Sequence, residues 1–298
     1  MKIKGIGMPF SSHQSSCSNR TPKNFEWTTE EFDIEVWLDM AIPSAIYVPI
    51  PKGKKRYAWF CESRAIVPQL RRAFEQEDLL NDILDSYDAI FTCDKMLVEK
   101  HDKVHFCFAG SNLPWIDKYS IPNKSKMLSF ICSNKSMCEG HRLRHQLHEK
   151  IKTTTNRDVP IDVFGGIIGT LFGYEPGCHM KGYPGDAWHD KSEALNDYMF
   201  SIVMENDVYD TYFTEKLTDC FATGTVPIYY GSRSIGEYFN TDGIIFLDGD
   251  ADVMYNTISQ VTPSMYYNRM DAIKDNMERV KNMQLADDML YDKIKELD

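Results

Sequence analysis

Short, almost uninterrupted apolar runs separated by helical patterns constrain the fold of this chain more than any other feature. The first part of the sequence contains such runs at 44–50 (SAIYVPI), 56–62 (RYAWFCE), 88–94 (DAIFTCD) and 104–110 (VHFCFAG). Strands that are buried on both faces of a parallel sheet have this continuous pattern. Residues 65–87 carry apolar positions at helical spacing, with Pro68 in a first turn or at a break. We therefore expect strand-helix-strand units with parallel strands.

A second series of the same kind begins near residue 127. Strand-like runs at 127–133, 161–165, 197–205, 226–231 and 243–248 alternate with helical patterns at 140–151 and 214–224. Two successive α/β series of similar length predict two Rossmann-like lobes, in which ligands lie beyond the carboxyl ends of the strands.

The expected linker is the NKSK stretch at 123–126, which follows a proline. This boundary gives an N-terminal lobe at 1–125 and a C-terminal lobe at 126–262. Apolar residues recur at helical spacing beyond Pro263, so a C-terminal helical segment is expected at 263–298.

The charge of the chain argues against two classes of partner. Among 298 residues, 33 Lys and Arg stand against 44 Asp and Glu, a net charge of −11. Nucleic acids and anionic membranes bind basic surfaces, so no nucleic-acid partner is expected, and a phosphate ligand would need a local cluster of cations.

The chain has no apolar run of about 18 residues and no signal-peptide pattern, so we expect no integral membrane segment and a cytoplasmic location.

Cysteine and histidine patterns do not predict a metal site. The eight cysteines are scattered, several of them within apolar runs, and none forms a Cys-x-x-Cys pair. Reduced core thiols are therefore expected rather than disulfides or zinc ligands. His141, His145 and His148 have helical spacing, but no carboxylate or thiol completes a tetrahedral set at a recognisable distance along the chain.

Residues 197–231 combine a strand, a polar loop, a helix start and a second strand. Glu205 and Asn206 end the first strand, and Thr214, Glu215 and Lys216 open the helix. Thr214 is the expected N-cap, and a glutamate in the first turn suits the helix dipole. The positive end of a helix also attracts anions, and a lysine beside it adds a charge for a phosphate. From the residues alone, ordinary capping and ligand binding both stay open.

The order of these elements closely resembles the donor-binding signature of the α-1,3-fucosyltransferases of glycosyltransferase family 10. That signature runs Phe-Glu-Asn, Thr-Glu-Lys, a small-residue turn, Val-Pro and a strand ending in Gly, and the match is tight from Tyr198 to Gly231. The resemblance implies an α/β fold of GT-B type, with two Rossmann-like lobes that have parallel sheets and a cleft between them, plus a C-terminal helix. It further implies that the N-terminal lobe at 1–125 is the acceptor side and that the C-terminal lobe at 126–262 binds the nucleotide sugar. It also implies donor-binding roles for Glu205, Asn206, Thr214, Glu215 and Lys216.

Looser agreement extends toward the N-terminus. FICSNKSMCEGHRLRHQLHEKI is similar to the family's Ser-Asn-Pro element and the helix that follows it, with Lys135 in place of the proline. The resemblance implies that Asn134 and an arginine of this helix bind the donor. The family spacing fits Arg144, and Arg142 stays an alternative. Two positions apart on a helix, these arginines cannot share a face, so we expect one of them to reach a diphosphate.

In the first lobe, RYAWFCESRAIVP resembles the family's strand that ends in Gly-Glu-Asn. The resemblance implies that Glu62 is the catalytic base. A structural alternative is that Glu62 pairs with Arg64 or Lys95.

The implied activity is inverting transfer of a sugar from a nucleotide-diphosphate donor, GDP-fucose in the simplest case, to a hydroxyl of a glycan acceptor. Glu62 would take the proton of the attacking hydroxyl, while Arg144, Lys216 and the helix end at Thr214 would stabilise the departing diphosphate without a metal or other cofactor.

Three alternatives stay open. A related enzyme that uses UDP-xylose or another UDP-sugar would keep most of these motifs, because donors share the fold and the diphosphate contacts. A non-catalytic sugar-nucleotide-binding module would keep the fold without the chemistry. A metal-dependent transferase would use Asp248 and Asp250 as an Asp-x-Asp site, although their glycine-containing sequence favours a turn.

Overall fold

The structure is a computed structural model that describes residues 1–7, 15–17, 20–67, 76–155, 158–165 and 191–297. Pro68 and Cys178 lie outside these residues. The chain forms two compact units. Unit 1 comprises Met1–Asn112, Tyr209–Tyr212 and Gln284–Asp298, and unit 2 comprises Leu113–Val208 and Phe213–Met283.

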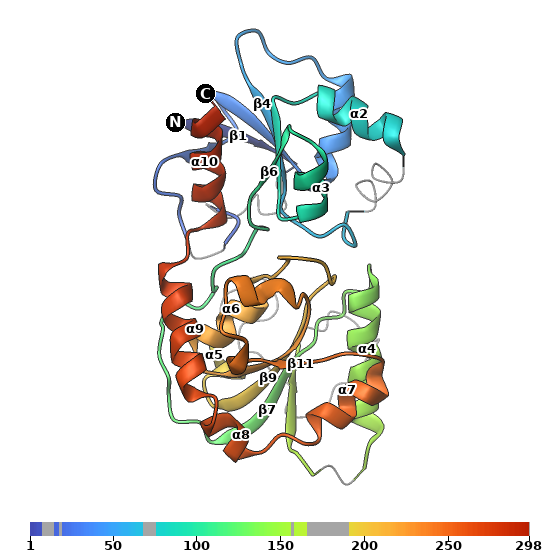
Figure 1. Cartoon of the computed structure of the whole chain (residues 1–298), viewed down its shortest axis with the longest axis vertical. Coiled ribbons are helices and arrows are strands. Elements are labelled where there is room, and N and C mark those ends of the chain that lie inside the picture. The colour runs from blue at the N-terminus through green and yellow to red at the C-terminus, as the bar shows by residue number, and fades with distance from the viewer. Residues whose placement is uncertain (8–14, 18–19, 68–75, 156–157, 166–190, 298) are drawn as a thin grey trace. The chain divides into compact units, whose positions relative to one another are not determined.

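Unit 1 is built on a parallel sheet with strand order β2-β1-β3-β4-β5-β6. The strands are β1 (Lys2–Ile6), β2 (Glu26–Thr28), β3 (Ile34–Leu38), β4 (Arg56–Phe60), β5 (Ala89–Thr92) and β6 (Val104–Phe106). Its helices are the 3₁₀ helix η1 (Asp39–Tyr47), α2 (Glu77–Asp85), α3 (Lys95–Lys100) and α10 (Ala286–Leu297). Figure 1 shows α10 on one side of this sheet and α2 and α3 on the other.

Unit 2 is built on a second parallel sheet with strand order β11-β10-β9-β7-β8. The strands are β7 (Lys126–Ile131), β8 (Ile161–Phe164), β9 (Tyr198–Met204), β10 (Val226–Tyr230) and β11 (Ile245–Phe246). Its helices are α4 (Glu139–Thr153), α5 (Ser192–Leu195), α6 (Glu215–Ala222), α7 (Ala251–Ile258), α8 (Pro263–Tyr267) and α9 (Met270–Asn282), with short 3₁₀ turns η2 (Ser234–Glu237) and η3 (Thr241–Gly243). Helices α4 and α7 pack together, as do α6 and α9, on opposite sides of the sheet (Figure 1).

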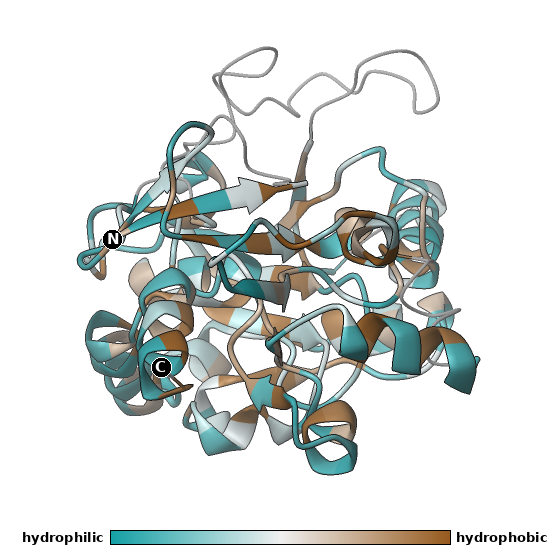
Figure 2. Ribbon diagram, turned by 90° about the horizontal axis from the view of Figure 1, so that it is seen from above, coloured by the Kyte–Doolittle hydropathy of each residue, from teal (hydrophilic) through white to brown (hydrophobic). Residues whose placement is uncertain are grey.

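Most of the predicted strands are confirmed, because continuous apolar runs form the interior of both sheets. All seven residues of β9 are buried, and Figure 2 shows hydrophobic segments on strands and hydrophobic stripes along helices. Seven cysteines are described as free thiols and most of them are buried, as expected. The C-terminal segment is helical but divided, with α8 and α9 in unit 2 and α10 in unit 1.

One predicted strand is wrong. Residues 44–50 do not join the sheet, because η1 occupies Asp39–Tyr47 and contains Pro43. Two further prolines, Pro49 and Pro51, lie within and beside this stretch and have no N–H for a sheet ladder. The strand that pairs with β4 from this part of the chain is instead β3. The sequence analysis did not predict β3, β1 or β2. Buried Glu35 interrupts the apolar pattern of β3.

Arg56 explains how β3 can carry a buried glutamate. Glu35 and Arg56 are register partners on β3 and β4, and the Arg56 Nε donates to Glu35 Oε1. The guanidinium also donates to the carbonyls of Ala45, Val48 and Pro49 at 3.2, 2.7 and 3.1 Å. The side chain is 1% exposed. The Arg56 guanidinium thus balances the charge of Glu35 and donates hydrogen bonds to carbonyls that lie outside the sheet.

We predict that Arg56→Met lowers the free energy of unfolding by about 3–5 kcal/mol, because it leaves a buried carboxylate without its partner. Urea unfolding followed by tryptophan fluorescence measures this loss. The matched control is the double variant Arg56→Met/Glu35→Leu, which removes both charges and is expected to recover much of the stability. A double variant no more stable than the single one would contradict this account.

Candidate functional site

The carboxyl ends of β7 and β9 in unit 2 bring together most of the predicted donor-binding residues. Ser133 and Asn134 follow β7, Glu205 and Asn206 follow β9, and helices α4 and α6 begin beside them. Adjacent parallel strands end at the same edge of a sheet, so residues distant in sequence converge there. Asn134 lies in the exposed loop before α4.

Glu205 is the centre of a buried polar cluster. Its side chain is fully buried, and its Oε1 accepts from the Thr214 backbone N–H at 2.9 Å. The Thr214 hydroxyl lies 2.9 Å from Glu205 Oε2 and accepts from the Lys216 N–H at 3.4 Å, which confirms Thr214 as the N-cap of α6. Lys216 Nζ lies 3.3 Å from Glu205 Oε2 and 2.9 Å from Thr214 Oγ1. The glutamate therefore fixes both the start of α6 and its lysine.

Helix α4 begins in direct contact with the end of β9. A Cβ on Gly140 would lie 2.6 Å from the carbonyl oxygens of both Glu205 and Asn206. The thiol of Cys138, the N-cap residue, donates to the Asn206 carbonyl at 3.3 Å. A glycine at position 140 therefore permits the approach that places α4 against the Glu205 cluster.

The two arginines of α4 differ as their spacing predicts. Arg142 is exposed, whereas Arg144 is 5% exposed and its guanidinium donates to Ser133 Oγ at 2.9 Å. The Nε of Arg144 is buried and has no hydrogen-bond partner among the described residues. Burial lowers the pKa of Arg144, and nearby Glu205 counteracts this shift. Arg144 is thus the arginine that faces the end of the sheet.

His141 is a site residue that the sequence reasoning considered only as a metal ligand. It is 2% exposed, and its Nδ1 has no hydrogen-bond partner among the described residues. Burial, together with the charges of Arg144, Lys135 and Lys216, lowers its pKa to about 4, against a side-chain hydrogen bond with Asn206. The signal in the sequence was the spacing of His141 and Arg144, three apart on one helix face. A neutral imidazole therefore lies within a concentration of positive charge.

Glu215 has a protein partner that sequence reasoning missed. Lys191 Nζ donates to Glu215 Oε1 at 3.0 Å and to Asp219 Oδ2 at 2.8 Å. Burial alone would raise the pKa of Glu215, but Lys191 and Lys216 lower it to about 2. Asp219 also accepts from the backbone N–H of Trp115 at 2.8 Å. Glu215 is therefore a charged member of a network that holds α6.

Glu62 lies in unit 1, shortly after β4. Its backbone N–H donates to Asp39 Oδ1 at 3.0 Å. Arg64, one of its proposed structural partners, forms an ion pair with Asp94. The carboxyl end of β4 thus carries Glu62 at the place where a parallel sheet presents its ligands.

The Asp248-Gly-Asp250 sequence is a turn with structural roles for both aspartates, as predicted. Gly249 has φ +77°, Asp248 pairs with Arg233, and Asp250 accepts from the Asp252 and Val253 N–H groups at the start of α7. In the part of the chain that the structure describes, no three His, Cys, Asp or Glu side chains are grouped as metal ligands.

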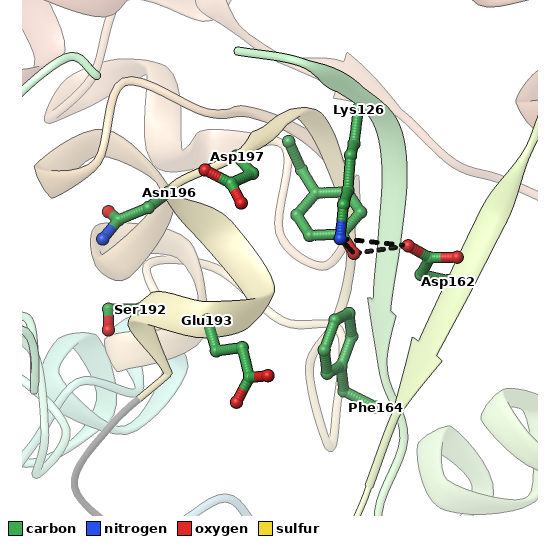
Figure 3. Close-up of a pocket in the computed structure, with 8 residues that line it drawn as sticks. Lys126, Asp162, Phe164, Ser192, Glu193, Asn196 and Asp197 are labelled. Carbon is green, nitrogen blue, oxygen red and sulfur yellow. Dashed lines mark hydrogen bonds and ion pairs between the residues drawn. The ribbon is translucent and has the colours of Figure 1, made fainter. Parts of the chain in front are cut away.

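A pocket of about 390 Å³ lies around the first residues of β7 and β9, away from the Glu205 cluster. Figure 3 shows Lys126 pointing toward Asp162, with Glu193 and Asp197 on the α5 side. Lys126 Nζ lies 3.1 Å from the Tyr198 hydroxyl, which donates to Asp162 Oδ2 at 2.5 Å. Its acidic lining and its place at the amino ends of these strands do not suit a diphosphate.

Two parallel sheets, each with helices on both sides, define the GT-B type of glycosyltransferase fold. Residues 121–248 match the family described as glycosyltransferase family 10 (fucosyltransferase) C-term. The matched segment contains the Glu205 cluster, His141 and Arg144.

Relatives identified by sequence are distant. The chain is 28% identical over 130 residues to the alpha-(1,3)-fucosyltransferase FucT of Helicobacter pylori, covering 44% of this chain and 23% of that protein. It is 26% identical over 152 residues to an alpha-(1,4)-fucosyltransferase of Arabidopsis thaliana, covering 48% and 36% of the two chains. These alignments span well under half of either relative.

Solved structures show the likeness of fold over most of the chain. A crystal structure of alpha1,3-fucosyltransferase with GDP-fucose has a TM-score of 0.52 at 15% sequence identity, covering 96% of this chain and 92% of that chain. The crystal structure of TarM has a TM-score of 0.56 at 10% identity, covering 89% of this chain and 54% of that chain.

Among the described residues, no helix has the length and apolar character needed to cross a membrane.

We predict that Gly140→Ala lowers the free energy of unfolding by about 1–3 kcal/mol, because the new methyl group meets two carbonyl oxygens that must move. Gly236→Ala is the matched control, since its Cβ would meet only the Thr241 methyl at 3.3 Å. The control is expected to change stability by less than about 1 kcal/mol. Equal losses for the two variants, measured by urea unfolding, would refute the close approach at Gly140.

Proposed function

We propose that this chain is an inverting fucosyltransferase that transfers fucose from GDP-fucose to a hydroxyl of a glycan acceptor. The observation that carries the proposal is the family 10 match over residues 121–248, which contains the buried Glu205-Thr214-Lys216 cluster beside Arg144 and His141. The activities named for the relatives agree with it.

The diphosphate of the donor would bind at the carboxyl ends of β7 and β9. When the bond to the sugar breaks, negative charge develops on the diphosphate, and fixed cations stabilise it most when they need no rearrangement. Lys216 is fixed by Glu205 and Thr214, and Arg144 by burial and Ser133. The Nδ1 of His141 and the Nε of Arg144 are two buried polar atoms that phosphate oxygens could satisfy.

The remaining predicted roles belong to the same proposal. Glu62 would accept the proton of the attacking hydroxyl, giving inversion at the sugar carbon. Asn134, Asn206 and Glu215 would contact the donor or support its loop, with Glu215 held by Lys191. The cations of the chain would suffice for the reaction, so we expect activity without an added metal ion.

A cytoplasmic location stays a prediction from the sequence, which cell fractionation would check.

The donor is tested by incubating the purified chain with a panel of GDP- and UDP-sugars and glycan acceptors, in the presence of a chelator. We expect product with GDP-fucose. Product with UDP-xylose or another UDP-sugar alone would replace the proposed donor. Tight nucleotide binding without transfer of any sugar would favour a non-catalytic binding module, and activity lost to the chelator would contradict metal independence.

The arginines of α4 provide a matched pair for the diphosphate contact. Arg144→Met is expected to weaken GDP binding by about 10–100-fold, the effect of losing charged hydrogen bonds to a phosphate. Arg142→Met removes the same charge from the exposed face of the same helix and is expected to change affinity by less than about twofold. Isothermal titration with GDP measures both. Equal weakening would mean that net charge, not contact with Arg144, governs binding.

Glu62→Gln is expected to lower the turnover number at least about 100-fold while leaving donor affinity unchanged, because it removes the base but no donor contact. Initial rates at saturating donor and a GDP titration measure the two effects. Transfer at the wild-type rate would remove Glu62 from the mechanism.

A further inference from the structure

The loop at 47–53 of unit 1 presents a contiguous group of apolar side chains to solvent. It begins with the last residue of η1 and leads into β4, and every one of its residues is exposed. Tyr47, Val48 and Ile50 are 87%, 42% and 44% exposed. Elsewhere in the described parts of the chain, exposed large hydrophobic residues stand singly along the sequence. Single apolar residues on a surface are ordinary, whereas a contiguous group indicates an interaction site.

Hydrogen bonds hold this loop in one conformation. The Arg56 guanidinium donates to the carbonyls of Val48 and Pro49 at 2.7 and 3.1 Å. The Lys54 N–H donates to the Pro51 carbonyl at 3.0 Å and closes a turn, and both prolines restrict the backbone further. A buried cation is thus used to keep apolar side chains in solvent. Because the loop is already ordered, a partner that covers it would pay little of the usual cost of ordering.

The charge around the loop is opposite in sign to that of the whole chain. No aspartate or glutamate occurs among residues 40–61, although the net charge is −11. Glu35 and Asp88, two carboxylates that meet this end of β4, are held by the guanidinium and by the backbone N–H of Arg56. Three lysines lie within the loop or directly after it, namely Lys52, Lys54 and Lys55. The loop therefore combines apolar side chains with positive charge.

We propose that the loop at 47–53 docks on an anionic phospholipid surface, with Tyr47, Val48 and Ile50 among the lipid head groups and the lysines against the phosphates. Tyrosine suits this boundary because its ring is apolar and its hydroxyl stays in water. Apolar residues beside lysines are typical of segments that lie on a membrane without crossing it. Charges beyond a Debye length, about 8 Å at physiological ionic strength, are screened, so the lysines next to the lipid outweigh the net charge.

Flotation of the full chain with lipid vesicles tests this proposal. One set of vesicles is phosphatidylcholine, and the other is an equal mixture of phosphatidylcholine and phosphatidylglycerol. We expect at least about tenfold tighter binding to the mixed vesicles, since each lysine near an anionic surface contributes about fivefold. Tyr47→Ser/Ile50→Ser should weaken this binding at least about tenfold, because two apolar side chains no longer leave water.

Matched controls remove the same groups from unit 2. Val253 and Tyr267 are 49% and 60% exposed, so Val253→Ser/Tyr267→Ser should change vesicle binding less than about twofold. Lys52→Glu should weaken binding about fivefold or more. Lys274→Glu makes the same change of net charge at a side chain that is 63% exposed, and should leave binding within about twofold.

Hydrogen exchange of the wild-type chain locates the contact without any substitution. Addition of the mixed vesicles should slow exchange within residues 47–55, and slowing confined to other segments would overturn the proposal. It is also overturned by no binding to either vesicle, by equal binding to both, or by equal losses in the loop variants and their controls. A wild-type dimer in sedimentation that Tyr47→Ser/Ile50→Ser abolishes would assign the loop to a second copy of the chain instead.

These measurements are independent of the proposed function. The loop precedes β4 and Glu62 follows it, so the substitutions lie at the opposite end of the strand from the predicted base. Vesicle binding is measured without donor or acceptor, so a chain that transfers no sugar still decides the role of the loop. Conversely, transfer to a water-soluble acceptor tests the proposed function whether or not vesicles bind.

Discussion

The burial of parallel strands on both faces is the constraint from which the chemistry of this protein follows. Where helices cover both sides of a sheet, polar side chains are confined to strand ends unless they are paired. Glu205 and Glu62 both follow strands whose residues are buried throughout, β9 and β4. The same apolar runs that form the cores therefore determine where carboxylates and cations can gather, and the carboxyl ends of the strands become the places where a ligand can be bound.

Buried charge in both units is held by several partners rather than one. Arg56 satisfies Glu35 and several carbonyls, and Lys191 joins Glu215 to Asp219. Glu205 receives hydrogen bonds from a backbone amide, a hydroxyl and an ammonium group. Such networks stabilise little relative to an apolar core, but they fix geometry, because removing one member leaves the others unsatisfied. Asp39 departs from this pattern, because its Oδ2 has no hydrogen-bond partner within the described parts of the chain.

Sequence reasoning succeeded where a signal was local and failed where it depended on partners distant in sequence. Thr214 was identifiable as an N-cap because capping involves residues within one helical turn. The choice between Arg142 and Arg144 required knowing which face of α4 lies against Glu205 and Asn206, and spacing alone does not specify that face. Strand β3 was missed because Glu35 is polar in sequence and becomes compatible with burial through Arg56, twenty-one residues later. Lys191 and Asp39 were missed for the same reason, since their partners lie on other elements.

The division of the chain into units has a consequence for how it can be cut. Unit 1 is discontinuous, since α10 returns to it from the end of the chain. The carboxylate of Asp287 on α10 accepts from the Ser16 N–H at 3.1 Å and from the indole N–H of Trp27 at 2.8 Å. A fragment ending at Asn112 would lose this anchor and expose apolar strand surface. An excised unit 1 should therefore include α10, and a fusion at the C-terminus should leave α10 in place. A circular permutant that joins α10 to residue 1 would make unit 1 nearly contiguous.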